Sequence, residues 1–303
     1  MSTDIEPAPL EHNLARGLPA VAAAIFFFAF ADALAKWFGQ AGYDSVQIVF
    51  FRYAFGLIPV AIAIAVSGTA GLRTKHPWLH VLRGLLMFSA LALFFRGLKY
   101  LPLAEGISVA FSAPLFVTAL SWPMLGERVG PYRWLAVVIG FVGALVILQP
   151  GTDAFRPEAL LILGSAVFFA LAVLHTRRMS RTETNVAMYT YSTIFAGLAT
   201  TPFLPFVWVA PEGNHLWLFL TLALIGGSAS YLMIVAYRNA PAALNASFEY
   251  TALIWAALIG WLYWGEQPSL AVWMGSGLIV AAGLAITYRE TKAGMVLPKR
   301  GRG

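Results

Sequence analysis

The chain repeats itself. Residues 96–150 and 237–290 are two versions of one segment, offset by a constant 139 residues without a gap. The matching positions are Lys99 and Arg238, Pro102 and Pro241, Gly126-Glu127 and Gly265-Glu266, and Trp134 and Trp273. Both copies are almost continuously apolar, so the repeat is expected to lie in a membrane. Duplicated membrane halves are typical of transporters that hold their substrate between the halves.

The composition supports a membrane protein and excludes several other classes. Hydrophobic residues make up 59% of the 303 residues and charged residues 11%, whereas a soluble domain carries about 25% charged residues. There is no cysteine, so disulfides, thiolate metal sites and thiol nucleophiles are excluded. The net charge of +6 comes from basic residues between apolar runs, so lipid is an expected partner and nucleic acid is not.

No motif indicates an enzyme or a bound cofactor. The sequence has no HExxH zinc motif and no glycine-rich phosphate-binding loop, such as the Walker motif of ATP-driven pumps. The connectors between the apolar runs are too short to hold a catalytic domain. We therefore expect neither catalysis nor a metal or other cofactor.

Ten apolar runs are long enough to cross a membrane as helices. A helix needs about 20 apolar residues to span a hydrocarbon core roughly 30 Å thick. The predicted spans are residues 17–37, 45–68, 77–98, 102–125, 131–149, 158–177, 185–208, 215–238, 241–264 and 269–288. Residues 17–149 then form a first five-helix repeat and residues 158–288 a second one, between a short N-terminal segment (1–16) and a basic tail (289–303).

The distribution of Lys and Arg predicts which side of the membrane each connector faces. The side of the N-terminus carries 14 of the 20 basic residues and the other side carries 4, while Arg52 and Arg83 lie within spans. Both termini are therefore expected in the cytoplasm. Five spans per repeat place Glu127 inside and its counterpart Glu266 outside, so the repeats are predicted to be inverted. Inverted repeats are a known basis of alternating access; the alternative is a duplicated scaffold without transport.

Several short motifs together resemble one family. They are Phe95-Arg96-Gly97-Leu98-Lys99-Tyr100-Leu101-Pro102-Leu103-Ala104-Glu105, Ser112-Ala113-Pro114-Leu115, Leu125-Gly126-Glu127-Arg128, Phe51-Arg52-Tyr53, Gly265-Glu266, and Lys36 at the end of the first span. In order and spacing they resemble the EamA branch of the drug/metabolite transporter superfamily over nearly all of residues 17–288. One departure is Leu253, where the family often has a proline that would match Pro114.

The resemblance implies an all-α integral membrane protein with ten transmembrane helices in two inverted five-helix bundles. It also implies export of small metabolites. Within the branch, the chain looks most like bacterial exporters of aromatic and other neutral amino acids, which implies the cytoplasmic (inner) membrane of a bacterium.

Charged residues inside the predicted spans are the first candidates for a substrate path, because each costs about 2.5–3.5 kcal/mol to insert. Asp32 and Lys36 lie four residues apart on one face of the first helix. They either neutralise each other, with Lys36 reaching the outer interface, or one of them faces a central cavity. Glu249 lies about two turns into the ninth span without a neighbouring cation in the sequence. Glu249 and Asp32 are candidates for proton coupling or for binding a substrate amine; a hydrogen bond to a neighbouring helix is the alternative for Glu249.

Four further ionisable residues are expected to have structural or gating roles. Arg52 cannot lose its proton, so it must find an acid or several carbonyls and is expected to lock helices together. Arg83 either extends to the cytoplasmic surface or lines an inner gate. Glu105 is expected to form a salt bridge with the basic residues that precede the fourth span. His175 is expected at the cytoplasmic interface, although it could titrate near neutral pH.

Aromatic and small polar residues complete the predicted substrate cavity. The mid-span rings in helices that build the cavity in this family are Phe28, Phe111, Phe168, Tyr231 and Tyr250. Such rings would bind an apolar side chain, while Ser108 and Ser112 would orient the polar groups of a substrate.

These features predict an alternating-access exporter of neutral or aromatic amino acids, either coupled to protons or uncoupled. An exporter of drugs, nucleobases or sugar derivatives is the alternative within transport. A membrane scaffold or receptor without transport is the alternative of another class. The sequence leaves the oligomeric state open.

Overall fold

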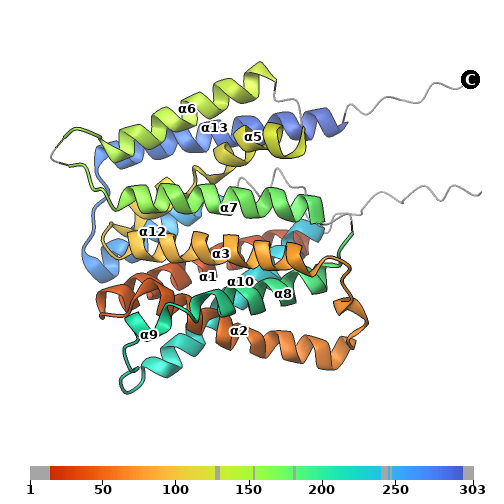
Figure 1. Ribbon diagram of the computed structural model, residues 1–303. Helices are drawn as coiled ribbons and strands as arrows, with labels where there is room; N and C mark the ends of the chain where they lie inside the picture. Colours follow the sequence, from red (N-terminus) through yellow and green to blue (C-terminus); the bar gives the residue numbers. More distant parts are fainter. Residues whose placement is uncertain are drawn as a thin grey trace, which may run out of the picture.

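The computed structural model describes residues 14–126, 130–152, 154–179, 182–239, 245 and 248–295. Within these ranges the regular structure is helical and contains no strand. The helices are α1 (Leu14–Gln40), α2 (Ser45–Ser67), the 3-10 turn η1 (Ala70–Leu72), α3 (Pro77–Leu98), α4 (Leu103–Ala110), α5 (Ala113–Leu125), α6 (Pro131–Leu148), α7 (Ala159–Met179), α8 (Asn185–Thr200), α9 (Leu204–Val207), α10 (His215–Asn239), α12 (Ala252–Trp264) and α13 (Leu270–Met295). Figure 1 shows that the longer helices lie side by side in one bundle.

Seven segments of the described chain are long and apolar enough to cross a membrane. They are Leu14–Gln40, Ser45–Ile62, Pro77–Leu98, Leu103–Leu125, Pro131–Leu148, Ala159–Met179 and His215–Ala236. Two shorter apolar helices cover Ala252–Trp264 and Leu270–Ile286. The described part of the chain is therefore all-helical, in agreement with the predicted fold class of an α-helical membrane protein.

Local sequence signals explain where many helices begin. Pro77 and Pro131 are the first residues of α3 and α6. A backbone N–H at the first helical position has no acceptor within the helix, so proline loses no hydrogen bond there. Asp44 precedes α2, and its carboxylate accepts a hydrogen bond from the Val46 amide at 2.9 Å. Thr184 caps α8 in the same way, which satisfies amide donors at the helix start.

The predicted fourth span, residues 102–125, is not one continuous helix. It is interrupted at residues 111–112, so that α4 ends at Ala110 and α5 begins at Ala113. Pro114 reinforces the interruption, since it lacks the amide that would continue the α4 ladder. The second repeat has the corresponding break, because α12 begins at Ala252, which is 139 residues after Ala113. Leu253 occupies the position of Pro114 there, so the break does not depend on a proline.

The predicted eighth span, residues 185–208, is also shorter than expected. Helix α8 ends at Thr200, and the short α9 follows it after a turn. Pro202 and Pro205 explain this end, because proline disfavours helical backbone at the preceding residue and cannot donate to the ladder. The predicted start of the ninth span at Pro241 and the motif residues Glu127 and Arg128 lie outside the described residues.

Helices at matching positions of the two repeats make matching contacts. The α1–α10 contact corresponds to the α3–α7 contact, α1–α12 to α5–α7, and α2–α10 to α3–α8. Helices α6 and α13 are counterparts and pack directly on each other (Figure 1). Gly143 and Gly275 meet where they cross, since a Cβ on either would lie within 2.7 Å of the other's carbonyl oxygen. Small residues at a crossing let two membrane helices approach closely.

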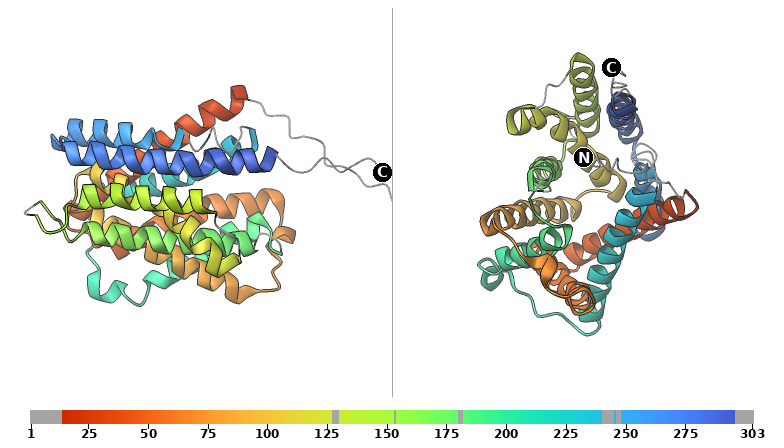
Figure 2. Two further views of the ribbon diagram at one scale, coloured as in Figure 1. Left: turned by 90° about the horizontal axis from the view of Figure 1, so that it is seen from above. Right: turned by 90° about the vertical axis from the view of Figure 1, so that its right-hand side faces the viewer.

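The bundle has two ends that matter for function. The described chain begins and finishes at one end, here called the terminal face (Figure 2). The opposite end holds the end of α1, the loop between α6 and α7, and the connector between α12 and α13; we call it the Lys36 face.

Candidate functional site

A buried ion pair lies at the Lys36 face. Lys36 is only 1% exposed and pairs with the carboxylate of Glu266. Its ammonium also donates to the Leu101 carbonyl at 2.7 Å, while the second Glu266 oxygen accepts from the Leu103 amide at 2.7 Å. We call these four residues the Lys36 lock. The lock joins α1, the α3–α4 junction and the α12–α13 connector.

Neighbouring residues shape the lock. Gly265 ends α12 with a φ of 67°, a left-handed conformation that glycine adopts without strain. Gly260 leaves room for the carboxylate, because a Cβ there would lie 2.7 Å from Glu266 Oε2. The Trp264 ring lies 4.8 Å from the Lys36 ammonium, within the range of a cation–π contact. The partner of Lys36 is therefore Glu266, and the described residues contain no ion pair between Lys36 and Asp32.

Arg52 lies inside the bundle without the acid or carbonyl partners that the sequence led us to expect. Its guanidinium lies against α10, where a Cβ at Gly226 would be 2.9 Å from the central carbon and from both terminal nitrogens. It also lies over the Phe95 ring of α3, 5.9 Å from the ring centre. Among the described residues, the buried Nη1 atom has no hydrogen-bond partner. The charge of Arg52 acts on Asp32 of α1, but no salt bridge joins the two.

Two predicted cavity rings meet at the helix breaks. Phe111 and Tyr250 occupy matching repeat positions, and their ring centres are 5.1 Å apart. Tyr250 fits because Gly283 of α13 lacks a side chain; a Cβ there would collide with the phenol oxygen. Ser112 is fully buried beside the first break, and its hydroxyl has no hydrogen-bond partner among the described residues.

Other predicted site residues have structural contacts. Ser108 is buried, donates to the Ala104 carbonyl at 2.6 Å and accepts from Ser276 at 2.7 Å. His175 is buried, with its Nε2 atom 2.9 Å from the Leu79 carbonyl. Arg83 donates to Thr176 of α7 and to the Met188 carbonyl of α8, so it ties three helices together.

The remaining candidates are more peripheral. Tyr231 is 67% exposed and shares its outer stripe of α10 with Leu224 and Trp217, so it faces away from the bundle and its predicted place in the cavity is wrong. Phe28, Phe168 and Glu249 are half-buried. Glu249 lies beside the second helix break, next to Tyr250.

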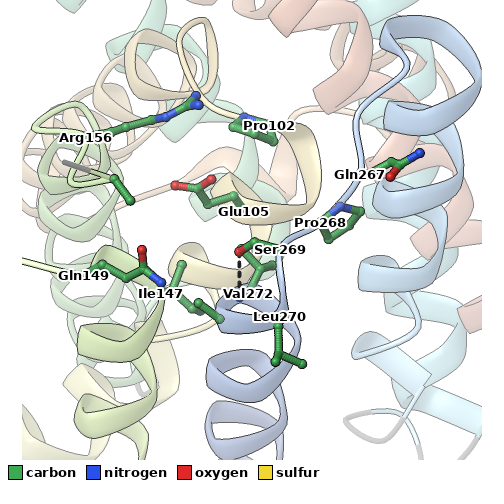
Figure 3. A pocket seen from close by; sticks show the side chains of 12 residues that line it. Pro102, Glu105, Ile147, Gln149, Arg156, Gln267, Pro268, Ser269, Leu270 and Val272 are labelled. Carbon is green, nitrogen blue, oxygen red and sulfur yellow. Dashed lines mark hydrogen bonds between the residues drawn. The ribbon is translucent and has the colours of Figure 1, made fainter. Parts of the chain in front are cut away.

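A pocket of about 480 Å³ lies beside the Lys36 lock. Pro102 and Gln267, which are neighbours of lock residues, line it together with Glu105, Gln149 and Arg156. Figure 3 shows Glu105 extending toward the side of the pocket where Arg156 and Gln149 lie. The predicted rim salt bridge of Glu105 is wrong, because Arg96 pairs with Asp44 instead, at 2.8 Å. Glu105 forms no ion pair within the described part of the chain.

Two clusters were not anticipated from the sequence. Phe38, Phe51 and Phe219 form a stack near the Lys36 face, with centroid distances of 3.8 and 4.3 Å to Phe219. At the terminal face, His80 of α3 pairs with Glu183 at 3.2 Å, and both side chains are buried. The residue types were visible in the sequence, but the pairings join segments more than a hundred residues apart.

Comparisons with known proteins agree with this architecture. The model of the EamA-like transporter family matches residues 15–149 and again residues 156–288. The chain is 30% identical to an S-adenosylmethionine uptake transporter of Rickettsia felis, over 86% of this chain and 89% of that protein. It is 31% identical to a riboflavin transporter of Vibrio cholerae, over 93% and 96% of the two chains.

Two further comparisons point the same way. A pseudopaline exporter, CntI, of Pseudomonas aeruginosa is 31% identical over 89% of this chain and 95% of its own length. A solved crystal structure shares the fold, with a TM-score of 0.62 at 22% identity over 92% of this chain and 98% of that one. The named relatives are transporters, in keeping with the prediction that the chain is not an enzyme. The chain belongs to the EamA-like transporter family of the drug/metabolite transporter superfamily.

Proposed function

We propose that this protein is an alternating-access carrier for small metabolites in the bacterial inner membrane. Its ten membrane helices would form two inverted five-helix halves, residues 17–149 and 158–288, with both termini in the cytoplasm. The matching helix contacts of the two repeats support this arrangement, as does the shared face on which the described chain begins and finishes.

The observation that carries the proposal is the Lys36 lock. Glu266 comes from the second half, and Lys36, Leu101 and Leu103 come from the first half. A contact between halves at one face is what alternating access requires, because that face must close before the other opens. In the proposed orientation, the lock closes the periplasmic side, and the pocket beside it is the vestibule through which substrate leaves.

The proposed substrates are amino acids or metabolites derived from them, moved outward. The sequence resemblance favours neutral and aromatic amino acids. The relatives named for S-adenosylmethionine, riboflavin and pseudopaline extend the class to larger metabolites that carry both polar groups and apolar or aromatic parts. Drugs, nucleobases and sugar derivatives remain the alternative substrates. Proton antiport through Asp32 or Glu249 is the proposed coupling, and uncoupled exchange is its alternative.

Counterflow in proteoliposomes tests this function. Vesicles loaded with unlabelled phenylalanine, threonine, methionine, S-adenosylmethionine or riboflavin receive the same labelled solute outside, with and without a pH gradient. A carrier accumulates label transiently, and only with a solute that it exchanges. A scaffold or receptor gives no accumulation with any solute, in protein shown to be folded by its thermal unfolding transition.

A further inference from the structure

Two opposite charges, Arg52 on α2 and Asp32 on α1, lie within membrane helices without an ion pair between them. Lys36 and Arg83, which also lie within membrane helices, are satisfied by the lock and by Thr176 and Met188. Arg52 and Asp32 are not: within the described residues, Arg52 Nη1 is buried without a hydrogen bond, and Asp32 has no hydrogen bond or salt bridge. Buried polar groups are normally satisfied, so the buried Nη1 of Arg52 needs a partner that the described part of the chain does not supply.

We propose that Arg52 and Asp32 bind the carboxylate and the ammonium of a substrate with an α-amino-acid group. This inference rests on the proposed transport function and names the part of the substrate that is recognised. The chemical class includes free amino acids and larger metabolites that retain the amino-acid group, such as S-adenosylmethionine. It excludes riboflavin, which has neither charge.

The geometry of Arg52 suits a carboxylate. The guanidinium lies flat on the backbone of α10 at Gly226, which keeps its plane fixed, and the Phe95 ring lies on another side. Neither contact is a hydrogen bond, and among the described residues Nη1 has no hydrogen-bond partner. A planar guanidinium binds a carboxylate through two parallel hydrogen bonds, which lysine cannot reproduce.

Asp32 supplies the complementary charge. It lies on α1, and Arg52 is the cation whose charge acts on it. Together they present one positive and one negative group, so a zwitterionic ligand leaves the site neutral. A ligand with a single charge would leave one of the two groups unpaired in a poorly solvated place, which disfavours binding.

Binding of labelled methionine and S-adenosylmethionine to the purified protein tests the assignment, with two competitors. Methionine methyl ester lacks the carboxylate, and the des-amino analogue lacks the ammonium. We expect unlabelled methionine to compete at least about tenfold better than either analogue, as the loss of a charged hydrogen bond implies. Arg52→Gln should abolish the preference for methionine over its ester only, and Asp32→Asn the preference over the des-amino analogue only.

A neighbouring glycine pair provides a test that keeps both charges. Gly226→Ala must displace the guanidinium, which is the movable end of a long side chain, so the fold should survive. Gly227→Ala is the matched control, because its nearest neighbour is a Pro59 carbon at 3.9 Å. We expect Gly226→Ala to weaken methionine binding about tenfold or more, with an unchanged unfolding temperature, and Gly227→Ala to leave binding unchanged.

The outcomes separate this inference from the proposed function. Equal competition by methionine and both analogues, or riboflavin counterflow without binding of either amino-acid probe, contradicts the recognition site while transport stands. Unchanged binding in both Arg52→Gln and Gly226→Ala contradicts it as well. Absence of counterflow for every solute contradicts the proposed function itself.

Discussion

At the scale of single residues, one buried ammonium joins three segments at the Lys36 face. Lys36 is almost fully buried and Glu266 only partly so, so water cannot compensate the Lys36 charge if Glu266 is removed. Removing one partner of a buried ion pair typically costs about 3–5 kcal/mol, because the other charge is left unbalanced. Loss of either charged residue is therefore expected to destabilise the contacts of the Lys36 lock.

Lys36→Met should favour the state in which the Lys36 face is open. The chain has no cysteine, so a single cysteine introduced at the buried Ala104 reports access to this face. We expect its reaction with a membrane-impermeant maleimide to accelerate at least about tenfold, equivalent to about 1.4 kcal/mol. Arg96→Met is the control, since its exposed pair with Asp44 should contribute little. Equal labelling of Lys36→Met and the parent would contradict the role of the lock.

Glu183 predicts a dependence of stability on acid pH. Burial raises its pKa, but interactions with Thr74 and His80 outweigh this and hold the pKa below its usual value of 4.5. A lowered carboxyl pKa stabilises the fold above that value, and the contribution is lost as pH falls through the folded pKa.

Glu183→Gln should therefore lower the unfolding temperature at pH 7, with a loss of about 1.5–3 kcal/mol for the charged hydrogen bond. It should also flatten the decline in unfolding temperature below about pH 4.5. Glu212→Gln, in the connector before α10, is the control. A decline of the same steepness in the variant and the parent would show that Glu183 does not contribute.

Charged residues show why a site is only partly predictable from sequence. Asp32, Lys36 and Arg52 could be recognised as costly to insert into a membrane, because each is a charged residue within an apolar run of the sequence. Their partners are set by packing between helices. The sequence offered Asp32, four residues away, as one possible partner of Lys36, whereas Lys36 pairs with Glu266, 230 residues away.

At the scale of helices, the two repeats have helix breaks at matching positions, before α5 and before α12. Ser112 and Thr251 have nearly the same backbone angles, with φ of −70° and −65°. One break is followed by a proline and the other by Leu253. The surrounding fold therefore imposes the second break, and the proline of the first copy only reinforces it.

Leu253→Pro should consequently be tolerated. Residue 253 lies in the first turn of α12, where proline loses only the hydrogen bond from the Leu253 amide to the Tyr250 carbonyl. We expect a loss of about 1 kcal/mol. Leu258→Pro, in the middle of the same helix, should cost about 3 kcal/mol or more. Thermal unfolding in detergent compares them, and equal losses would mean that α12 continues through residue 253.

Helix boundaries were predictable where a local signal marks them. Pro77, Pro131 and Asp44 fix helix starts through their own backbone or side chain. The interruptions at residues 111–112 and 250–251 lie within runs that remain apolar, so hydropathy gives no sign of them, and the second lacks even a proline.

At the scale of the whole molecule, α6 and α13 join the two repeats through glycines. A Cβ at Gly275 would lie 2.5 Å from the Gly143 carbonyl oxygen, and a backbone atom cannot move aside cheaply. We expect Gly275→Ala to destabilise the protein by about 1–3 kcal/mol. Gly277→Ala, with no atom within 4 Å of the new Cβ, should have little effect. Equal unfolding temperatures for the two variants would show that this crossing does not hold the repeats together.

The repeat itself was the part of the architecture that the sequence made plain, because a constant offset of 139 residues survives in positions such as Pro102 and Trp134. Which side chains cross from one repeat to the other was not predictable. Glu266 appeared as a repeat marker and not as half of the lock, since no sequence pattern relates it to Lys36.

The contact between Phe111 and Tyr250 has a mechanical consequence. The two rings are counterparts, so the pseudo-two-fold axis that relates the proposed halves passes between them. If the halves exchange conformations as proposed, a contact between unlike positions is replaced by the contact between their counterparts, whereas a contact between counterparts, such as this ring pair or the packing of α6 on α13, is mapped onto itself. We therefore expect the two rings to stay in contact both when the proposed carrier faces inward and when it faces outward.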